Sequence, residues 1–287
     1  MKPNVEIFEV GPRDGLQNEK RLISAQDKIA LVDLLSTAGF QRIEVASFVS
    51  PKWVPQMATS AQVLGGIKRA SGISYAALTP NLRGLEGAIA AKADEVAIFG
   101  SASEGFSKAN INASIAESLE RFRPVASAAK DAGIPVRGYI SCVVNCPYDG
   151  PTAPEAVVSV AKELHAMGCY ELSLGDTTGQ AYPEEITKML TAVREAVPDA
   201  VLAGHYHDTS GRALDNIEAS LECGVRVFDG AIGGLGGCPY APGASGNVAS
   251  EAVHARLTAL GYETGLNADV LEKAADMARA LREGDLA

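Results

Sequence analysis

The feature that most constrains the fold is a regular alternation of short β-rich runs with longer runs of helical periodicity. Eight strand-like runs are predicted, at residues 5–10, 42–48, 74–78, 95–100, 136–143, 171–174, 201–207 and 227–232. Amphipathic helical runs separate them, and the clearest lie at 24–38, 154–167, 183–197, 213–223 and 248–260. Eight such units in a chain of 287 residues predict a closed (β/α)₈ barrel, or TIM barrel.

The helical runs begin and end at residues that favour those positions. Ser24 is a candidate N-cap, Pro154 opens a first turn, and Gly39 and Gly168 follow the ends of two runs. A further helix at 267–282 lies beyond the repeat. We expect one domain over 1–287, with the barrel at about 5–262 and a C-terminal extension at about 263–287. An open doubly wound sheet would need a glycine-rich phosphate loop after its first strand, and the run 11–15 (GPRDG) is not one.

Composition excludes several partners. Lysine plus arginine number 25 and aspartate plus glutamate 35, and the resulting net charge of −10 argues against nucleic-acid binding. No apolar run approaches the roughly 18 residues of a membrane span. The first strand begins too near Met1 for a signal peptide, so we expect a cytoplasmic protein. Five cysteines, an odd number in a chain of this size, indicate reduced thiols.

In a TIM barrel the active site lies at the carboxyl ends of the strands. The unusual polar residues of this chain fall at or near those ends, namely Arg13, Asp14, Glu44, Ser47, Asp176, His205, His207 and Asn247. A barrel that only bound a ligand would have no reason to collect them there. Their concentration therefore predicts an enzyme.

His205 and His207 are predicted to enter the mouth of the barrel together, because residues i and i+2 of a strand point to the same face. Two imidazoles at this place favour a divalent metal site over a hydrogen-bonded core pair. A carboxylate is then expected as a third ligand. Asp14 qualifies because the first and eighth strands are neighbours in a closed barrel, and Asn247 could add a carbonyl oxygen.

Two further candidates come from the surroundings of these residues. Glu44 is a carboxylate in an apolar strand, and Arg13 is the nearest cation to pair with it. The pair is either a structural ion pair or a device that aims the Arg13 guanidinium at a substrate, and both can hold. Cys238 lies among glycines in the loop after the eighth strand, where a thiol could act as an acid or base.

Together these residues resemble the 3-hydroxy-3-methylglutaryl-CoA (HMG-CoA) lyase family. The similar strings are EVGPRDGLQNEK at 9–20, Glu44 with SFVSPKWVPQ at 47–56, HYHDT at 205–209, and GLGGCPYAPGASGN at 234–247. The cysteine-loop string is highly specific for this family. The RD and HxHDT elements are shared with a wider group of metal-dependent barrels that catalyse aldol- and Claisen-type reactions.

The resemblance implies roles for individual residues. Asp14, His205, His207 and Asn247 would bind Mg²⁺ or Mn²⁺. Arg13 would stabilise negative charge on the substrate, with support from Glu44, while Cys238 and Asp176 would act in the chemistry. Arg13, Lys20, Ser47 and Asn110 are the candidates for binding the acyl-CoA substrate. The family also implies a homodimer or higher homo-oligomer.

The implied reaction is the cleavage of HMG-CoA to acetyl-CoA and acetoacetate, as in leucine degradation and ketone-body formation. The roles of acid and base stay open among Asp14, Asp176 and Cys238. The alternatives are a related lyase for another branched 3-hydroxyacyl-CoA and a metal-dependent barrel hydrolase. A hydrolase would be expected to carry its HxH pair on the first strand rather than the seventh, and a synthase to carry extra domains.

Overall fold

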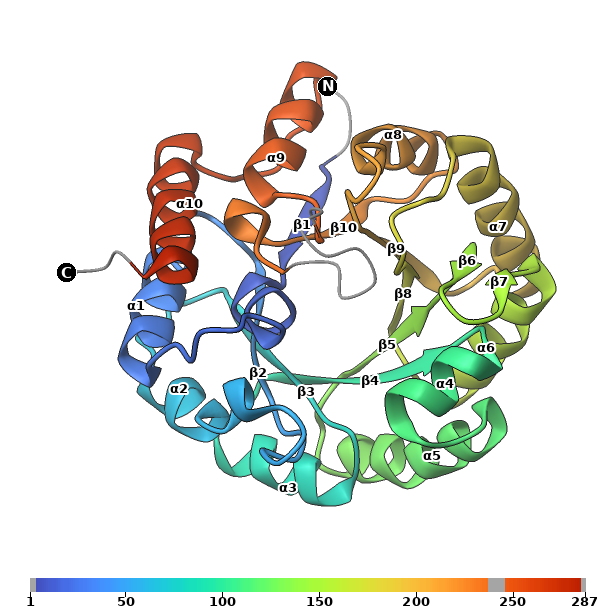
Figure 1. Cartoon of the computed structure of the whole chain (residues 1–287), viewed down its shortest axis with the longest axis horizontal. Helices are drawn as coiled ribbons and strands as arrows, with labels where there is room; N and C mark the ends of the chain where they lie inside the picture. The colour runs from blue at the N-terminus through green and yellow to red at the C-terminus, as the bar shows by residue number, and fades with distance from the viewer. Residues whose placement is uncertain (1–3, 237–245, 285–287) are drawn as a thin grey trace.

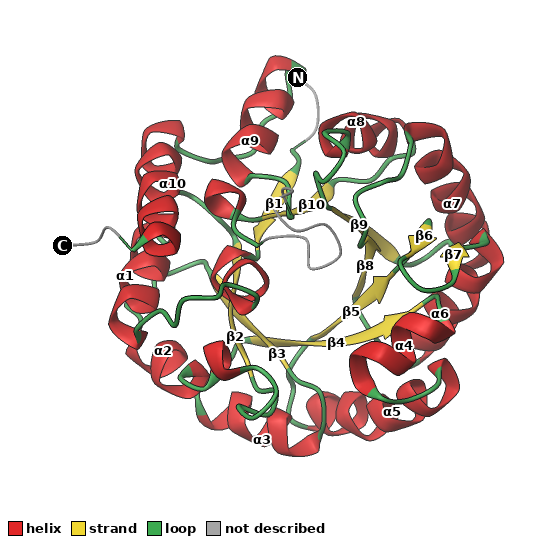
Figure 2. Ribbon diagram, viewed as in Figure 1, coloured by secondary structure: helices red, strands yellow, loops and turns green. Residues whose placement is uncertain are grey.

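The structure of the chain, a computed structural model, describes residues 4–236 and 246–284. Its centre is a closed barrel of eight parallel strands surrounded by helices (Figures 1 and 2). The strands are β1 (Glu6–Glu9), β2 (Arg42–Ser47), β3 (Ser74–Leu78), β4 (Glu95–Ser101), β5 (Val136–Ser141), β8 (Glu171–Asp176), β9 (Val201–Tyr206) and β10 (Val227–Gly230). The predicted TIM barrel is therefore confirmed, and the open doubly wound alternative is wrong because β1 pairs with both β2 and β10.

The outer layer consists of α1 (Ala25–Leu35), α2 (Ser60–Gly66), α3 (Leu82–Ala90), α4 (Glu104–Ile111), α5 (Ile115–Asp131), α6 (Pro154–Ala166), α7 (Pro183–Ala196), α8 (Ala213–Glu222) and α9 (Ser250–Ala259). The Ser24 hydroxyl accepts a hydrogen bond from the Asp27 amide, so Ser24 caps α1 as predicted. The predicted extra helix is α10 (Ala268–Glu283), which lies beside α1 at the side of the barrel (Figure 1).

Short elements follow several of the barrel strands at the mouth of the barrel. A turn of π-helix, η1 (Gly11–Gly15), follows β1, and the 3₁₀ turns η2 (Pro55–Met57) and η3 (Ile232–Gly234) follow β2 and β10. A two-stranded hairpin, β6 (Asn145–Cys146) and β7 (Gly150–Pro151), follows β5. None of the helices in the described part of the chain has the length and hydropathy of a membrane span.

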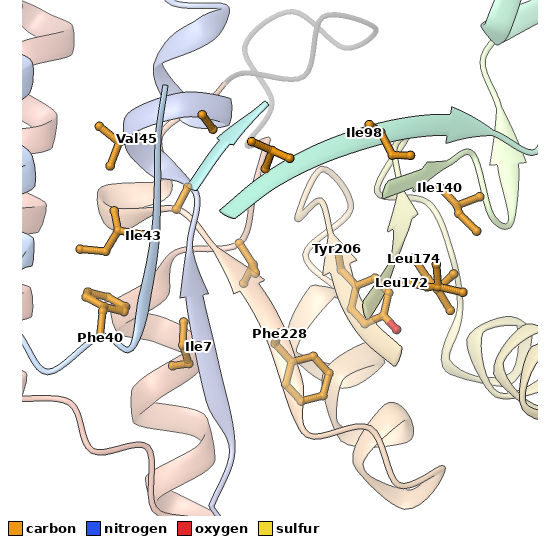
Figure 3. Packing of buried hydrophobic residues seen from close by; sticks show 14 of the residues in the cluster. Ile7, Phe40, Ile43, Val45, Ile98, Ile140, Leu172, Leu174, Tyr206 and Phe228 are labelled. Carbon is orange, nitrogen blue, oxygen red and sulfur yellow. The ribbon is translucent and has the colours of Figure 1, made fainter. Parts of the chain in front are cut away.

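The main hydrophobic core lies between the strands and the helices. Figure 3 shows some of its side chains, among them Ile43, Ile98, Ile140, Leu174 and Phe228. Because side chains alternate along a strand, their neighbours in sequence point into the barrel instead. Several of those neighbours are charged or hydrogen-bonding residues, including Glu44, Arg137, Tyr139, Glu171 and Asp229. The interior of the barrel therefore contains a buried polar layer.

Glu9, at the end of β1, ties together three segments at the mouth. Its carboxylate accepts hydrogen bonds from the amides of Gly11 (2.8 Å) and Ile232 (2.9 Å) and from the hydroxyl of Ser250 (2.5 Å). Burial raises the pKa of Glu9 from 4.5 to about 7, although these hydrogen bonds oppose the rise. Between pH 4.5 and about 7, folded Glu9 holds a proton that the unfolded chain has already lost.

A pH-dependent effect of Glu9→Gln on stability follows from this shift. Because the folded pKa is raised, the contribution of Glu9 is fully present below pH 4.5 and is lost as the pH rises through about 7. The loss of stability in the variant should therefore be larger at pH 5 than at pH 8, by about 3 kcal/mol. Urea unfolding of the metal-free proteins at both pH values measures the difference, and an equal loss at both would contradict it.

Candidate metal centre and active site

The loop after β1 brings Arg13 and Asp14 to the mouth of the barrel. Arg13 is 5% exposed, and its guanidinium donates to Glu44 Oε2 at 2.6 Å and to Asp14 Oδ1 at 2.5 Å. Burial alone would lower the pKa of Arg13, but Glu44 and Asp14 raise it well above its usual range. The expected ion pair of Arg13 with Glu44 is present. Tyr139 adds a hydrogen bond to the same Glu44 oxygen at 3.1 Å.

His205 and His207 lie at the end of β9, with ring centroids 5.6 Å apart. Together with Asp14 they form a group in which one possible ligand atom of each residue lies within 4.8 Å of the others. Asp14 Oδ2 is 3.9 Å from His205 Nε2. The Nδ1 atom of His207 is buried without a hydrogen-bond partner among the described residues. This arrangement fits a divalent cation.

The electrostatics keep two of the candidate ligands, Asp14 and His207, in their metal-binding forms at neutral pH. Burial lowers the pKa of the third, His205, but Asp229 and Asp14 outweigh burial and raise it. Burial raises the pKa of Asp14, but Arg13 and His205 outweigh it and lower the pKa to about 2. Burial and the neighbouring His205 lower the pKa of His207 to about 4, while Asp14 opposes them. A carboxylate and a neutral imidazole are the forms that bind a metal.

Asn247 lies beside the group but presents its amide nitrogen rather than its carbonyl oxygen. Its Nδ2 donates to Asp14 Oδ2 at 2.8 Å, and its backbone forms a bridge with that of His207. A turn of the amide would exchange the two atoms. The close packing of the loop after β1 against the loop after β10 depends on Gly15, since a Cβ at this position would lie 2.6 Å from the Cβ of Leu235.

The remaining predicted residues are placed differently. Asp176 is buried at the end of β8, where its carboxylate accepts hydrogen bonds from the Ala181 amide (3.0 Å) and the Thr178 hydroxyl (3.4 Å) of its own loop, and burial raises its pKa. Ser47 is fully buried, and its hydroxyl has no hydrogen-bond partner among the described residues. Lys20 is exposed. Cys238 lies outside the described residues.

A cleft of about 1410 Å³ opens over the group. Arg13, Asp14, His205 and His207 line it, as does Asn110 of α4, whereas Lys20, Ser47 and Asp176 do not. Among the described residues that line the cleft, the other charged side chains are all cationic: Arg83, Lys108 and Arg121. The cleft therefore combines a candidate metal site at one end with a cationic wall.

Sequence reasoning missed part of the site. Asp229 on β10 hydrogen-bonds His205, and Arg137 and Ser173 hydrogen-bond Asp229. The same signal that identified Glu44, a charged residue inside an apolar strand, is present at Arg137 and Asp229. The sequence alone does not show which of these interior positions face one another in the closed barrel.

A pair of histidines and an aspartate at the mouth of a closed barrel define the class of metal-dependent TIM-barrel enzymes. The family model described as HMGL-like matches residues 4–278. The chain belongs to the HMG-CoA lyase family, which confirms the resemblance and the expectation of a lyase.

Three relatives illustrate the likeness. The "3-hydroxy-3-isohexenylglutaryl-CoA/hydroxy-methylglutaryl-CoA lyase" of Pseudomonas aeruginosa is 57% identical over 93% of this chain and 89% of its own length. The crystal structure of the HMG-CoA lyase from Brucella melitensis is 58% identical, with a TM-score of 0.97 over 98% of this chain and all of that one. An HMG-CoA lyase from Acinetobacter baumannii in complex with coenzyme A and 3-methylmalate is 36% identical, with a TM-score of 0.92 over 98% and 92% of the two chains.

Proposed function

We propose that this chain cleaves HMG-CoA to acetyl-CoA and acetoacetate in a reaction that depends on a divalent metal. The observation that carries the proposal is the meeting of Asp14, His205 and His207 with the buried Arg13 at one end of the cleft. The names of the relatives support the same reaction. Mg²⁺ or Mn²⁺ is the ion that the family resemblance implies, and the oxygen ligands of Asp14 and Asn247 suit either ion.

Asp14, His205 and His207 would hold the metal, with Asn247 as a fourth ligand after its amide turns. When bound, the metal supplies Lewis acidity for the tertiary hydroxyl of the substrate. In the cleavage the hydroxyl loses its proton to a base, the bond between C2 and C3 breaks, and its electron pair passes to the acetyl-CoA enolate. Arg13 would stabilise the enolate oxygen, held in place by Glu44. An acid then returns a proton to C2.

The acid and the base are drawn from Asp14, Asp176 and Cys238, as the resemblance implies. Asp14 lines the cleft, while the Asp176 carboxylate is turned into its own loop, so that Asp14 is the better placed of these two. Lys20 and Ser47 do not line the cleft, and Asn110 is the better supported candidate for substrate contact.

An acyl-CoA substrate is supported by the size and charge of the cleft. Its volume of about 1410 Å³ exceeds the roughly 300–1,000 Å³ of ordinary small-molecule pockets. Arg83, Lys108 and Arg121 offer cations to the phosphates of coenzyme A. The complex of the Acinetobacter baumannii relative with coenzyme A supports this assignment. A homodimer or higher homo-oligomer and a cytoplasmic location stay part of the proposal.

A related lyase for a longer branched 3-hydroxyacyl-CoA is the second candidate, because the Pseudomonas aeruginosa relative carries both substrates in its name. Incubation with Mg²⁺ and a panel of CoA thioesters distinguishes the two. We expect equal amounts of acetyl-CoA and acetoacetate from HMG-CoA, and no acetyl-CoA from 3-hydroxybutyryl-CoA, which lacks the carboxylate and the tertiary hydroxyl. Faster cleavage of the isohexenyl substrate would favour the second candidate, and release of free coenzyme A alone would indicate a hydrolase.

A further inference from the structure

The imidazole of His205 is held from behind by a buried carboxylate. Asp229 lies directly opposite His205 in the pairing of β10 with β9, and its Oδ2 is 3.0 Å from His205 Nδ1. With Asp229 ionised, Nδ1 must carry the proton of this hydrogen bond. Nε2 is therefore the ring nitrogen left to face Asp14, at 3.9 Å from Oδ2, and to bind an ion there.

Asp229 is itself held from two other strands. Arg137 on β5 donates from Nη2 to Oδ1 at 2.7 Å and from Nη1 to Oδ2 at 3.0 Å. Ser173 on β8 donates to Oδ2 at 2.8 Å. The side chain of Asp229 has no exposed surface. A carboxylate with both oxygens bonded in this way has one orientation, and it imposes that orientation on His205.

From Asp229 the contacts continue away from the metal group as a network of alternately charged side chains inside the barrel. Arg137 donates from Nε to Glu171 at 2.6 Å, Glu171 accepts two hydrogen bonds from Arg42, and Arg42 donates to Glu6 at 2.6 Å. Glu6, at the start of β1, lies at the opposite end of the barrel from His205. The network therefore contains an ion pair of the same kind, Arg42–Glu6, that is remote from the metal group.

We propose that Asp229 is a positioning residue for the metal, holding His205 with Nε2 directed at the ion, and that Arg137 and Ser173 hold Asp229 for this purpose. The inference rests on the metal ligands of the proposed function. A carboxylate behind a metal-binding histidine typically changes metal affinity by about 10–100-fold. An ion pair that merely stabilised the barrel would leave metal affinity unchanged.

The test is the dissociation constant of Mn²⁺ for the full chain without substrate, from the electron paramagnetic resonance signal of free Mn²⁺. Asp229→Asn should weaken binding by about 10–100-fold. Because this variant takes one of two carboxylate partners from the buried Arg137 guanidinium and leaves only Glu171, a second variant, Arg137→Met/Asp229→Asn, removes both charges of the Arg137–Asp229 pair. We expect the same weakening there. Thermal unfolding of the metal-free proteins shows that each variant is folded.

Glu6→Gln is the matched control, because it breaks the Arg42–Glu6 ion pair of the same network at the end of the barrel away from the metal group. Its affinity for Mn²⁺ should equal that of the wild type. Unchanged affinity in folded Asp229→Asn or in the double variant would overturn the inference, as would equal weakening in Glu6→Gln. A wild-type chain that binds no Mn²⁺ would overturn the proposed function first, so the two failures are distinguishable.

Discussion

Replacement of His207 by alanine is expected to remove the bound divalent metal and to lower kcat/KM by about 10³-fold or more. His207 is one of the three residues whose ligand atoms converge at the mouth of the barrel. Its low pKa, about 4, keeps the ring neutral and available at the pH of the cell. Charge stabilisation by a bound metal is worth several kcal/mol in the transition state, and this sets the size of the loss.

The measurements are metal content after dialysis and turnover of HMG-CoA. His254→Ala serves as the control, because His254 lies on α9 and its ring contacts Thr264 rather than the metal group. The control should keep both its metal and its activity. Stoichiometric Mg²⁺ or Mn²⁺ in the His207→Ala protein would remove His207 from the ligand set.

Arg13→Gln is expected to lower kcat by about 10²-fold or more with little change in metal content. In the proposed mechanism the guanidinium stabilises the developing enolate oxygen, and the ion pair with Glu44 at 2.6 Å holds the guanidinium in place. An uncharged amide cannot stabilise that oxygen to the same extent. Measurement of kcat at saturating HMG-CoA and of Mn²⁺ affinity in the same samples tests the prediction.

Removal of Arg13 alone leaves Glu44 as a buried carboxylate without its cation, which costs about 3–5 kcal/mol of stability. The variant Arg13→Gln/Glu44→Gln avoids this and should lose kcat to the same degree. Arg69→Gln, which breaks an ion pair with Asp94 nearer the surface, is the control and should turn over at the wild-type rate. Full turnover in either Arg13 variant would show that Arg13 has no part in the chemistry.

Much of the fold could be predicted because the eight-fold repeat consists of periodicities and helix caps that each extend over a short stretch of sequence. Each predicted strand run overlaps one barrel strand, and the helix stops at Gly39 and Gly168 lie just past the ends of α1 and α6. The ends of elements were less accurate. The eighth strand was predicted at 227–232 but stops at Gly230, since Ile232 already belongs to the turn η3. Such boundaries depend on which backbone groups find partners, and sequence periodicity does not report that.

For the candidate site, position along the chain was enough to select Arg13, Asp14, His205 and His207 but not to orient side chains. Ser47 and Asp176 occupy strand ends, as the selection required, yet neither lines the cleft. The direction of a side chain at a strand end depends on how the following loop folds back. In the case of Asp176, its own loop supplies the hydrogen bonds that turn the carboxylate away.

By itself the sequence determined the eight-fold repeat and the class of residue at the mouth, because strand periodicity and helix caps act over a few residues. Only the tertiary structure decided which of those residues meet. Closure of the barrel places β1 beside β10, and so brings Asp14 to Asn247 across 233 positions of the chain. The interior likewise joins Arg137 to Asp229 across 92 positions. These contacts arise because side chains from different strands share one buried space in which each charge needs a partner.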